Sequence, residues 1–155
     1  MKTTIFLLAI AAMSFNANAQ KIKADEVPAA VKAKQASLYP NAKVSKWEKE
    51  DGNFEAEFDN GKVETSVLID ASGNLLQTET EITSNNLPKS VNDYVTKNLG
   101  GKKIKEAAKI VDSKNTTTYE AEVDEIDYIF DANGNFLKKE VEKDNDKDKD
   151  EKKGK

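Results

Sequence analysis

The sequence predicts an α+β fold made of a tandem repeat, in which each unit has one helix followed by a four-stranded antiparallel sheet. Several short segments occur twice within the 155 residues, which is the mark of a duplicated unit. Each copy opens on a proline followed by apolar residues at helical spacing. Each then changes to an alternation of apolar and polar residues, which is typical of strands with one buried face. One helix covering one sheet face gives the α+β layout.

The duplication is clearest in three pairs of matching segments. They are 27–31 with 87–91, 54–58 with 119–123, and 69–76 with 130–137. We therefore predict a first repeat over residues 20–82 and a second over 83–142. The polar stretch 83–86 is typical of a linker between them.

Each repeat begins with a predicted helix. Pro28 and Pro88 stand at the start of the two helical patterns, where a missing N–H group costs nothing. Apolar residues of the second pattern share one helix face, and they are Leu87, Val91, Tyr94 and Val95. That pattern ends at Gly100-Gly101, and the first ends at Pro40.

Four strands are predicted after each helix. Their approximate ranges are 43–50, 53–59, 62–70 and 75–82, then 103–113, 116–124, 126–131 and 135–142. Asp51-Gly52 and Asn60-Gly61 predict two-residue hairpin loops of type I′, because both central residues of that turn need positive φ. The segments 70–73 and 131–134 predict four-residue turns with glycine in the left-handed conformation.

The two ends of the chain predict segments outside the fold. Residues 1–19 have the charged, apolar and small-residue layout of a secretory signal peptide, so we expect a periplasmic or secreted protein. No cysteine follows the cleavage site to accept a lipid anchor. Neither the apolar stretch of this segment nor any other apolar run is long enough for a transmembrane segment. Residues 143–155 contain no apolar side chain and are expected to form a disordered charged tail.

The composition excludes several chemistries. The chain has no histidine, cysteine or arginine, so catalytic triads, thiolate metal sites, disulfides and bidentate phosphate clamps are all missing. A net charge of −4 opposes binding to nucleic acid. We expect a protein that is not an enzyme, with no cofactor and no bound metal.

Two acidic patterns are candidates for chemical sites. Asp131, Asn133 and Asn135 alternate as oxygen donors, but Gly134 does not stand where a calcium-binding EF-hand loop needs its glycine, and turn chemistry explains the segment. Paired carboxylates on the outer strand face could serve a glycosidase, but they lie on a surface expected to be wet. These are Glu55, Glu57, Glu120 and Glu122.

Three apolar residues do not fit the alternation. Leu68 and Ile129 have the parity of the outward sheet face, and Trp47 has the opposite parity to Val44 in the same strand. They either pack between the repeats or under a loop, or they form a partly apolar surface with Trp47 as the anchor for a partner protein.

These features together resemble the PepSY-like proteins of Bacteroidetes-type bacteria, which are described as beta-lactamase-inhibitor-like. The resemblance rests on the export signal, the Leu/Val-Pro-x-x-Val helices, the aromatic-Glu-Ala-Glu strands and the Asp-x-x-Gly-Asn turns, and covers residues 25–142. It implies a duplicated fold whose two sheets can join into one curved surface. By analogy with beta-lactamase inhibitor proteins, it also implies binding to another protein through the exposed sheet surface. This chain lacks the disulfides that those inhibitor proteins carry.

The sequence therefore predicts an exported, non-enzymatic binding protein, an inhibitor or modulator of an envelope hydrolase that acts through its exposed sheet face. The partner would be another envelope or secreted protein. A small-ligand or cation-binding envelope protein is the alternative, with the acidic strand faces as donors.

Overall fold

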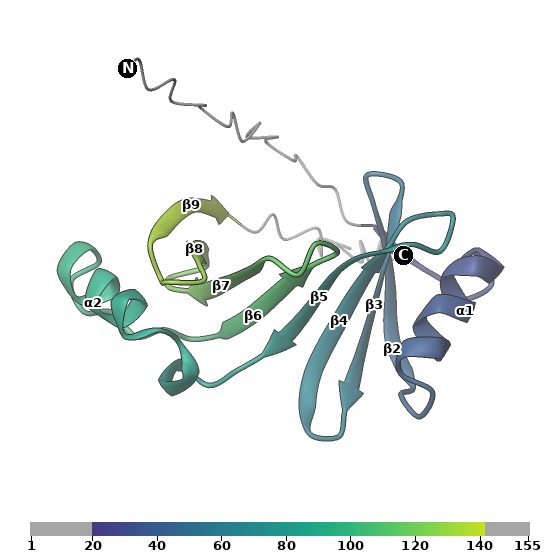
Figure 1. The fold of residues 1–155 in the computed structure, drawn as a ribbon, viewed down its shortest axis with the longest axis horizontal. Coiled ribbons are helices and arrows are strands. Elements are labelled where there is room, and N and C mark those ends of the chain that lie inside the picture. The colour runs from purple at the N-terminus through teal and green to yellow at the C-terminus, as the bar shows by residue number, and fades with distance from the viewer. Residues whose placement is uncertain (1–19, 142–155) are drawn as a thin grey trace, which may run out of the picture.

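The computed structural model describes residues 20–141 (Figure 1). The predicted signal peptide and charged tail lie outside this range. The described elements, in chain order, are β1 (Gln20–Ile22), α1 (Ala29–Leu38), β2 (Val44–Glu50), β3 (Asn53–Asn60), β4 (Val63–Ile69), β5 (Leu75–Glu81), a 3-10 turn (Ser84–Asn86), α2 (Lys89–Asn98), β6 (Ala107–Asp112), β7 (Thr117–Glu122), β8 (Ile126–Asp131) and β9 (Phe136–Val141).

All nine strands form one antiparallel sheet whose spatial order is the order of the chain. Four strands follow each helix, but they do not form a separate sheet, because β5 pairs with β6 from Gln77–Asp112 to Glu81–Ala108. The three-residue strand β1 was not predicted, and it pairs with the outer edge of β2. The prediction of two helices on an antiparallel α+β framework is confirmed, whereas the pair of four-stranded sheets is replaced by one sheet of nine.

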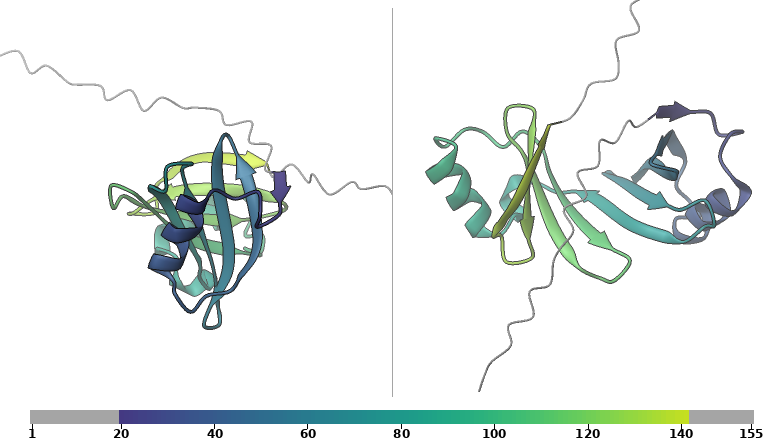
Figure 2. Two further views of the ribbon diagram at one scale, coloured as in Figure 1. Left: turned by 90° about the vertical axis from the view of Figure 1, so that its right-hand side faces the viewer. Right: turned by 90° about the horizontal axis from the view of Figure 1, so that it is seen from above.

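Both helices lie on the same face of this sheet. Val67 belongs to the core under α1 and faces Thr78 in β5, which in turn faces Val111 in β6. Val111 has the same parity as Ala107, a member of the core under α2, so the two cores share a face. In Figures 1 and 2 the helices lie at opposite ends of the molecule, outside the sheet. The sheet is therefore curved, with the helices on its convex face.

Each helix covers its own hydrophobic core. The core under α1 contains Val31 together with side chains of β2, β3 and β4, and Phe58 is in contact with the Tyr39 ring at 4.7 Å between centroids. The core under α2 contains Val91, Val95 and side chains of β6, β7 and β8. Each core contains four aromatic rings, which are Trp47, Phe54, Phe58 and Tyr39 in the first and Tyr94, Tyr119, Tyr128 and Phe130 in the second.

The two turns that begin at Asp70 and Asp131 have the same structure. In each, the aspartate Oδ1 accepts hydrogen bonds from two backbone N–H groups, and its Oδ2 accepts one from the asparagine side chain four residues on. Gly73 and Gly134 have φ of 89° and 78°. The turn prediction is confirmed. The carboxylates of Asp70 and Asp131 accept their hydrogen bonds from N–H groups of their own turns.

Another hairpin differs from its prediction. Asn60 pairs with Val63, so the central residues of the β3–β4 loop are Gly61 and Lys62. Only Gly61 of these two has a positive φ, of 77°, which is the pattern of a type II′ turn. The Asp51-Gly52 loop has positive φ at both positions, as a type I′ turn requires.

Candidate binding surface

The concave face of the sheet is the face opposite the two helices, and no described helix covers it. The strand register assigns its side chains, since residues directly opposite each other share a face. Carboxylates dominate this face. By register they are Glu48, Glu50, Glu55, Glu57, Asp59, Glu64, Glu79, Glu81, Asp112, Glu120, Glu122, Asp127, Asp131 and Glu140. Lys21, Lys46 and Lys138 share the face with them.

Trp47 does not lie on this surface. It pairs with Ala56 and belongs to the core under α1, with 7% of its surface exposed. A β-bulge at Ser45 shifts the register between Val44 and Lys46, so that Val44 and Trp47 both point toward the helix-covered face. The Ser45 hydroxyl donates to the Glu57 carbonyl at 2.9 Å within this bulge. The hypothesis that Trp47 anchors a partner is therefore wrong.

Leu68 and Ile129 lie on the concave face, as their parity predicts. Leu68 stands between Glu55 and Gln77, and Ile129 between Glu120 and Lys138. Leu68 is half-buried, whereas only 6% of Ile129 is exposed. Leu68 can therefore contact a molecule in the concavity, while Ile129 mainly supports the floor of the surface.

Glu55, Glu57, Glu120 and Glu122 also lie on the concave face, and all four are half-buried rather than fully wet. Burial raises the pKa of Glu55, and the charges of Glu57, Glu50 and Glu48 raise it further. The Ser66 hydroxyl donates to Glu55 Oε1 at 2.7 Å and offsets part of this rise. Glu55 also faces Glu48 directly, which is a repulsive cross-strand pair. The surface therefore concentrates negative charge at an energetic cost.

Lys46 partly neutralises this cluster. Its Nζ lies 2.9 Å from Glu57 Oε1 and 3.0 Å from Glu48 Oε2. Burial lowers the pKa of Lys46, but the hydrogen bonds and charges of Glu57 and Glu48 outweigh it and hold that pKa above its ordinary value. Oxygen atoms of Glu48, Glu55 and Glu57 come within 4.8 Å of one another, close enough to ligate one cation. Lys46 already supplies a positive charge there.

The two ends of the sheet approach each other across the concavity. Burial raises the pKa of Glu50 in β2, and the charges of Asp51, Glu48 and Glu140 add to the rise. Glu140 belongs to β9, which is separated from β2 by six strands in the sheet order. Only curvature of the whole sheet brings them within electrostatic range. Sequence reasoning missed Glu50 and Glu140 because their proximity depends on this curvature, and it missed Lys46 because of the bulge.

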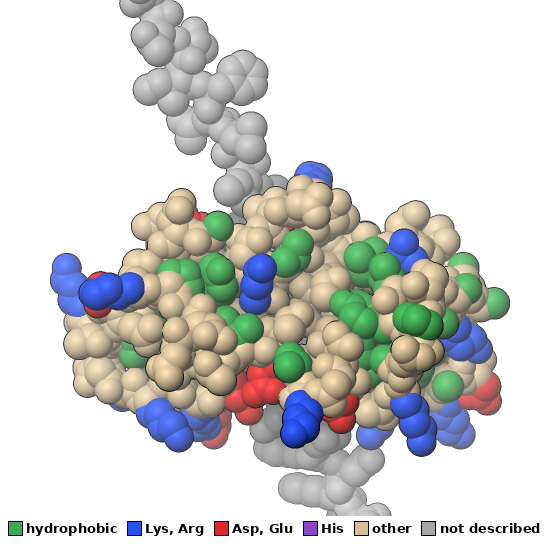
Figure 3. Space-filling view, turned by 60° about the horizontal axis from the view of Figure 1, so that its bottom comes forward, with side chains coloured by type: hydrophobic (Ala, Val, Ile, Leu, Met, Phe, Trp, Pro, Cys, Tyr) green, Lys and Arg blue, Asp and Glu red, His purple; other side chains and the backbone are tan. Residues whose placement is uncertain are grey.

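Figure 3 shows one face of the molecule, with the largest group of acidic side chains in its lower middle. Lysines lie toward the edges of this face, near its middle and beside the acidic group. A partner that approaches an acidic area meets a local potential that the net charge of −4 understates.

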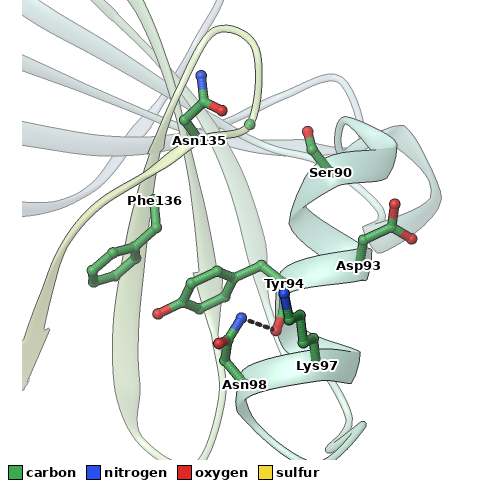
Figure 4. Close-up of a pocket in the computed structure, with 8 residues that line it drawn as sticks. Ser90, Asp93, Tyr94, Lys97, Asn98, Asn135 and Phe136 are labelled. Atoms are coloured by element: carbon green, nitrogen blue, oxygen red, sulfur yellow. Dashed lines mark hydrogen bonds between the residues drawn. The ribbon is translucent and has the colours of Figure 1, made fainter.

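One shallow pocket of about 320 Å³ lies between α2 and the turn before β9 (Figure 4). Its wall contains Tyr94, whose ring stacks on Phe136 at 4.9 Å between centroids. The Asn98 side chain donates to the Tyr94 carbonyl at 3.0 Å. The Asp93 carboxylate in this wall is exposed and is paired with Lys89 at 2.6 Å. This exposed carboxylate differs from the desolvated carboxyl that a glycoside hydrolase uses as its general acid.

A family comparison accounts for this architecture. A family model described as "putative beta-lactamase-inhibitor-like, PepSY-like" matches the chain twice, over residues 13–77 and 70–138. The chain belongs to this PepSY-like family. The two matches support the tandem organisation. No curated protein matches the sequence.

Solved structures from Bacteroides share the fold of this PepSY-like protein. A BLIP-like protein from B. fragilis is 27% identical with a TM-score of 0.61, covering 76% of this chain and 90% of that one. A putative periplasmic protein from B. eggerthii is 16% identical with a TM-score of 0.65, covering 74% and 88%. A DUF2874 family protein from B. uniformis is 20% identical with a TM-score of 0.64, covering 73% and 88%. Among residues 20–141, no helix has the length and apolar character needed to cross a lipid bilayer.

Proposed function

We propose that this PepSY-like protein is an exported, non-enzymatic binding protein that holds a positively charged segment of another envelope or secreted protein against its concave face. The observation that carries the proposal is the crowding of half-buried carboxylates on a sheet face that no described helix covers. Its fold and its family's beta-lactamase-inhibitor-like description add support for protein binding.

The electrostatics of the surface favour a cationic partner. The raised pKa values of Glu50 and Glu55 mean that ionised carboxylates are disfavoured there in the free protein. A lysine or arginine side chain that enters the concavity would relieve the repulsion between these carboxylates. Part of the binding free energy would therefore come from removing repulsion that is present in the free protein. Leu68 would supply an apolar contact beside the charges.

The proposed partner is an envelope hydrolase whose activity the protein inhibits or modulates. A curved sheet can enclose a protruding loop, and occupation of a loop near a catalytic cleft blocks substrate. The place of action is the periplasm or the exterior of the cell, in keeping with the predicted signal peptide and with the B. eggerthii neighbour described as periplasmic.

Binding of a small cation is the second candidate, favoured by the proximity of oxygen atoms from Glu48, Glu55 and Glu57. The ammonium group of Lys46 counts against it, because a cation would have to displace or share that contact. Calorimetric titration with Ca²⁺ and Mg²⁺ separates the two. If the wild type shows heat of binding that the Glu55→Gln variant lacks, the result supports cation binding. If the wild type shows no heat of binding, the result supports the partner-protein proposal.

Affinity capture from an envelope extract tests the main proposal. The wild-type chain should retain a partner that Glu55→Gln combined with Glu120→Lys does not retain. Asp93→Asn, which removes a negative charge from the exposed face of α2, is the control away from the concave face and should capture as wild type. Identical capture by all three proteins would contradict the proposal. Adding the wild-type chain to the captured hydrolase then measures inhibition directly.

A further inference from the structure

The last strand of the sheet, β9, has an edge with which no strand of residues 20–141 pairs. It is six residues long, while the opposite edge strand, β1, has three. Three of its side chains are exposed apolar groups, namely Phe136 at 39%, Leu137 at 51% and Val141 at 66%. A long edge with exposed apolar side chains is a template for pairing with another strand.

The apolar side chains of β9 gather on one side of it. A register shift between Ile129 and Phe130 makes Leu137 the bulged residue, next to Phe136. Phe136 stacks on Tyr94 of α2 (Figure 4), so this is the helix-covered side. Val141 faces Ile126, which packs against the same core. Lys138 and Glu140 point to the concave side instead, and Lys138 Nζ lies 2.6 Å from Glu140 Oε1.

Two-fold symmetry restricts how two copies of this edge can pair. The symmetry axis of an antiparallel pair of identical strands must be normal to the sheet, so one residue faces its own copy. With Lys138 at that position, Phe136 would face Glu140. With Glu140 there, two glutamates would face each other and Lys139 would face Val141.

Among the registers centred on residues 138–140, only the one centred on Lys139 is complementary. With Lys139 facing its copy, Leu137 faces Val141 and Lys138 faces Glu140, and symmetry makes each of these pairs occur twice. Both apolar pairs then lie on the helix-covered side, and both ion pairs lie on the concave side. Opposite charges and apolar groups directly across two strands stabilise the pairing.

We propose that β9 is a dimerisation edge, which pairs antiparallel with β9 of a second copy in the register centred on Lys139. The facing Lys139 side chains oppose the contact, and their repulsion keeps it reversible. The dimer joins two nine-stranded sheets edge to edge, with all helices on one side and both concave faces on the other. This inference is independent of the proposed function, because it concerns an edge rather than a face.

The test measures the dimer fraction by sedimentation equilibrium across protein concentrations, with chains that begin at the predicted mature N-terminus, Gln20. The wild type should dimerise reversibly. Glu140→Lys turns both Lys–Glu pairs of the contact into Lys–Lys pairs and should weaken dimerisation about tenfold or more. Combining Lys138→Glu with Glu140→Lys restores opposite charges in this register and should restore the dimer.

Two further variants distinguish pairing through the β9 edge from nonspecific association through exposed apolar residues. Leu137→Glu should abolish the dimer, while Val63→Glu, at an exposed apolar residue of β4 with 40% exposure, should leave it unchanged. Circular dichroism checks that each variant is folded. Monomeric wild-type protein at all concentrations, a dimer that survives Glu140→Lys or Leu137→Glu, or failure of the charge swap to rescue would each overturn the proposal.

Discussion

Single carboxylates have opposite roles in this molecule, depending on what surrounds them. Asp70 and Asp131 accept hydrogen bonds from their own turns, chiefly from Asn74 and Asn135, and these bonds lower the pKa of both carboxyls. Glu55 lies on the concave face, where burial raises its pKa. The first two therefore stabilise the fold when ionised, and the third does so when protonated.

Trp47→Ala should destabilise the protein by about 3–5 kcal/mol, because it removes a large buried side chain from the core under α1. Chemical denaturation of the variant measures this loss. Leu68→Ala, on the half-buried concave face, should cost clearly less. A nearly unchanged unfolding midpoint for Trp47→Ala would show that the side chain does not pack in the core.

Parity along a strand predicted Leu68 and Ile129 correctly but not Trp47. Alternation assumes an unbroken ladder, and the extra residue at Ser45 breaks it. The hydrogen bond from Ser45 to the Glu57 carbonyl is a contact between strands, so the residues around Ser45 alone did not reveal it. The mutual approach of Glu50 and Glu140 was equally hidden, because it depends on curvature accumulated over the sheet.

At the scale of the elements, each helix is held to its repeat through a glycine turn. A Cβ on Gly73 would lie 3.0 Å from the Ala30 carbonyl oxygen in α1, and a Cβ on Gly134 would overlap the Ser90 hydroxyl in α2. That hydroxyl donates to the Asn133 carbonyl at 2.6 Å. The glycines recognised as turn residues in the sequence thus also allow close approach of helix and hairpin.

Gly134→Ala should therefore destabilise the protein by more than about 1 kcal/mol, through positive φ and through steric overlap with Ser90. Gly52→Ala is the matched control, since Gly52 has φ of 84° and nothing within 4 Å of an added Cβ. Thermal unfolding compares the two. Equal losses would mean that contact with α2 adds nothing to the cost of the backbone conformation.

The strand and helix segments could be predicted because alternation, proline and glycine signals recur in both halves. The boundary between the repeats at residues 82 and 83 stays a prediction, since the two family matches overlap at 70–77. The single sheet could not be read from local patterns. Pairing of β5 with β6 joins residues of different repeats across the linker and α2, so no local sequence pattern reports it.

At the scale of the whole molecule, the concave face makes stability depend on pH. Glu50 and Glu55 have raised pKa values, so their contribution is fully present below their ordinary value of 4.5 and is lost as pH rises through the raised values. Asp70, Asp112 and Asp131 have lowered pKa values, so their contribution is lost as pH falls through values below 3.8. Stability should therefore be highest in mildly acidic solution.

Glu55→Gln tests this dependence. The amide can still accept the Ser66 hydrogen bond, and loss of the charge removes repulsion from Glu48, so the variant should be more stable at pH 7 by about 0.2–1 kcal/mol. Its gain in stability on acidification should be smaller than that of the wild type. Urea unfolding at several pH values measures both effects, with exposed Glu64→Gln as control. A destabilised Glu55→Gln variant at pH 7 would refute the electrostatic account.

The short strand β1 determines whether such a sheet ends or continues. In the duplicated order β6 corresponds to β2 and β9 to β5, so the β5–β6 junction could recur between molecules as β9 against the β2 of the next. Gln20–Ile22 already occupies the β2 edge and places Ile22 against the core. A chain without these residues would offer two compatible ends and should grow head to tail into filaments. By covering the edge of β2, these three residues thus prevent the sheet from extending from one molecule to the next.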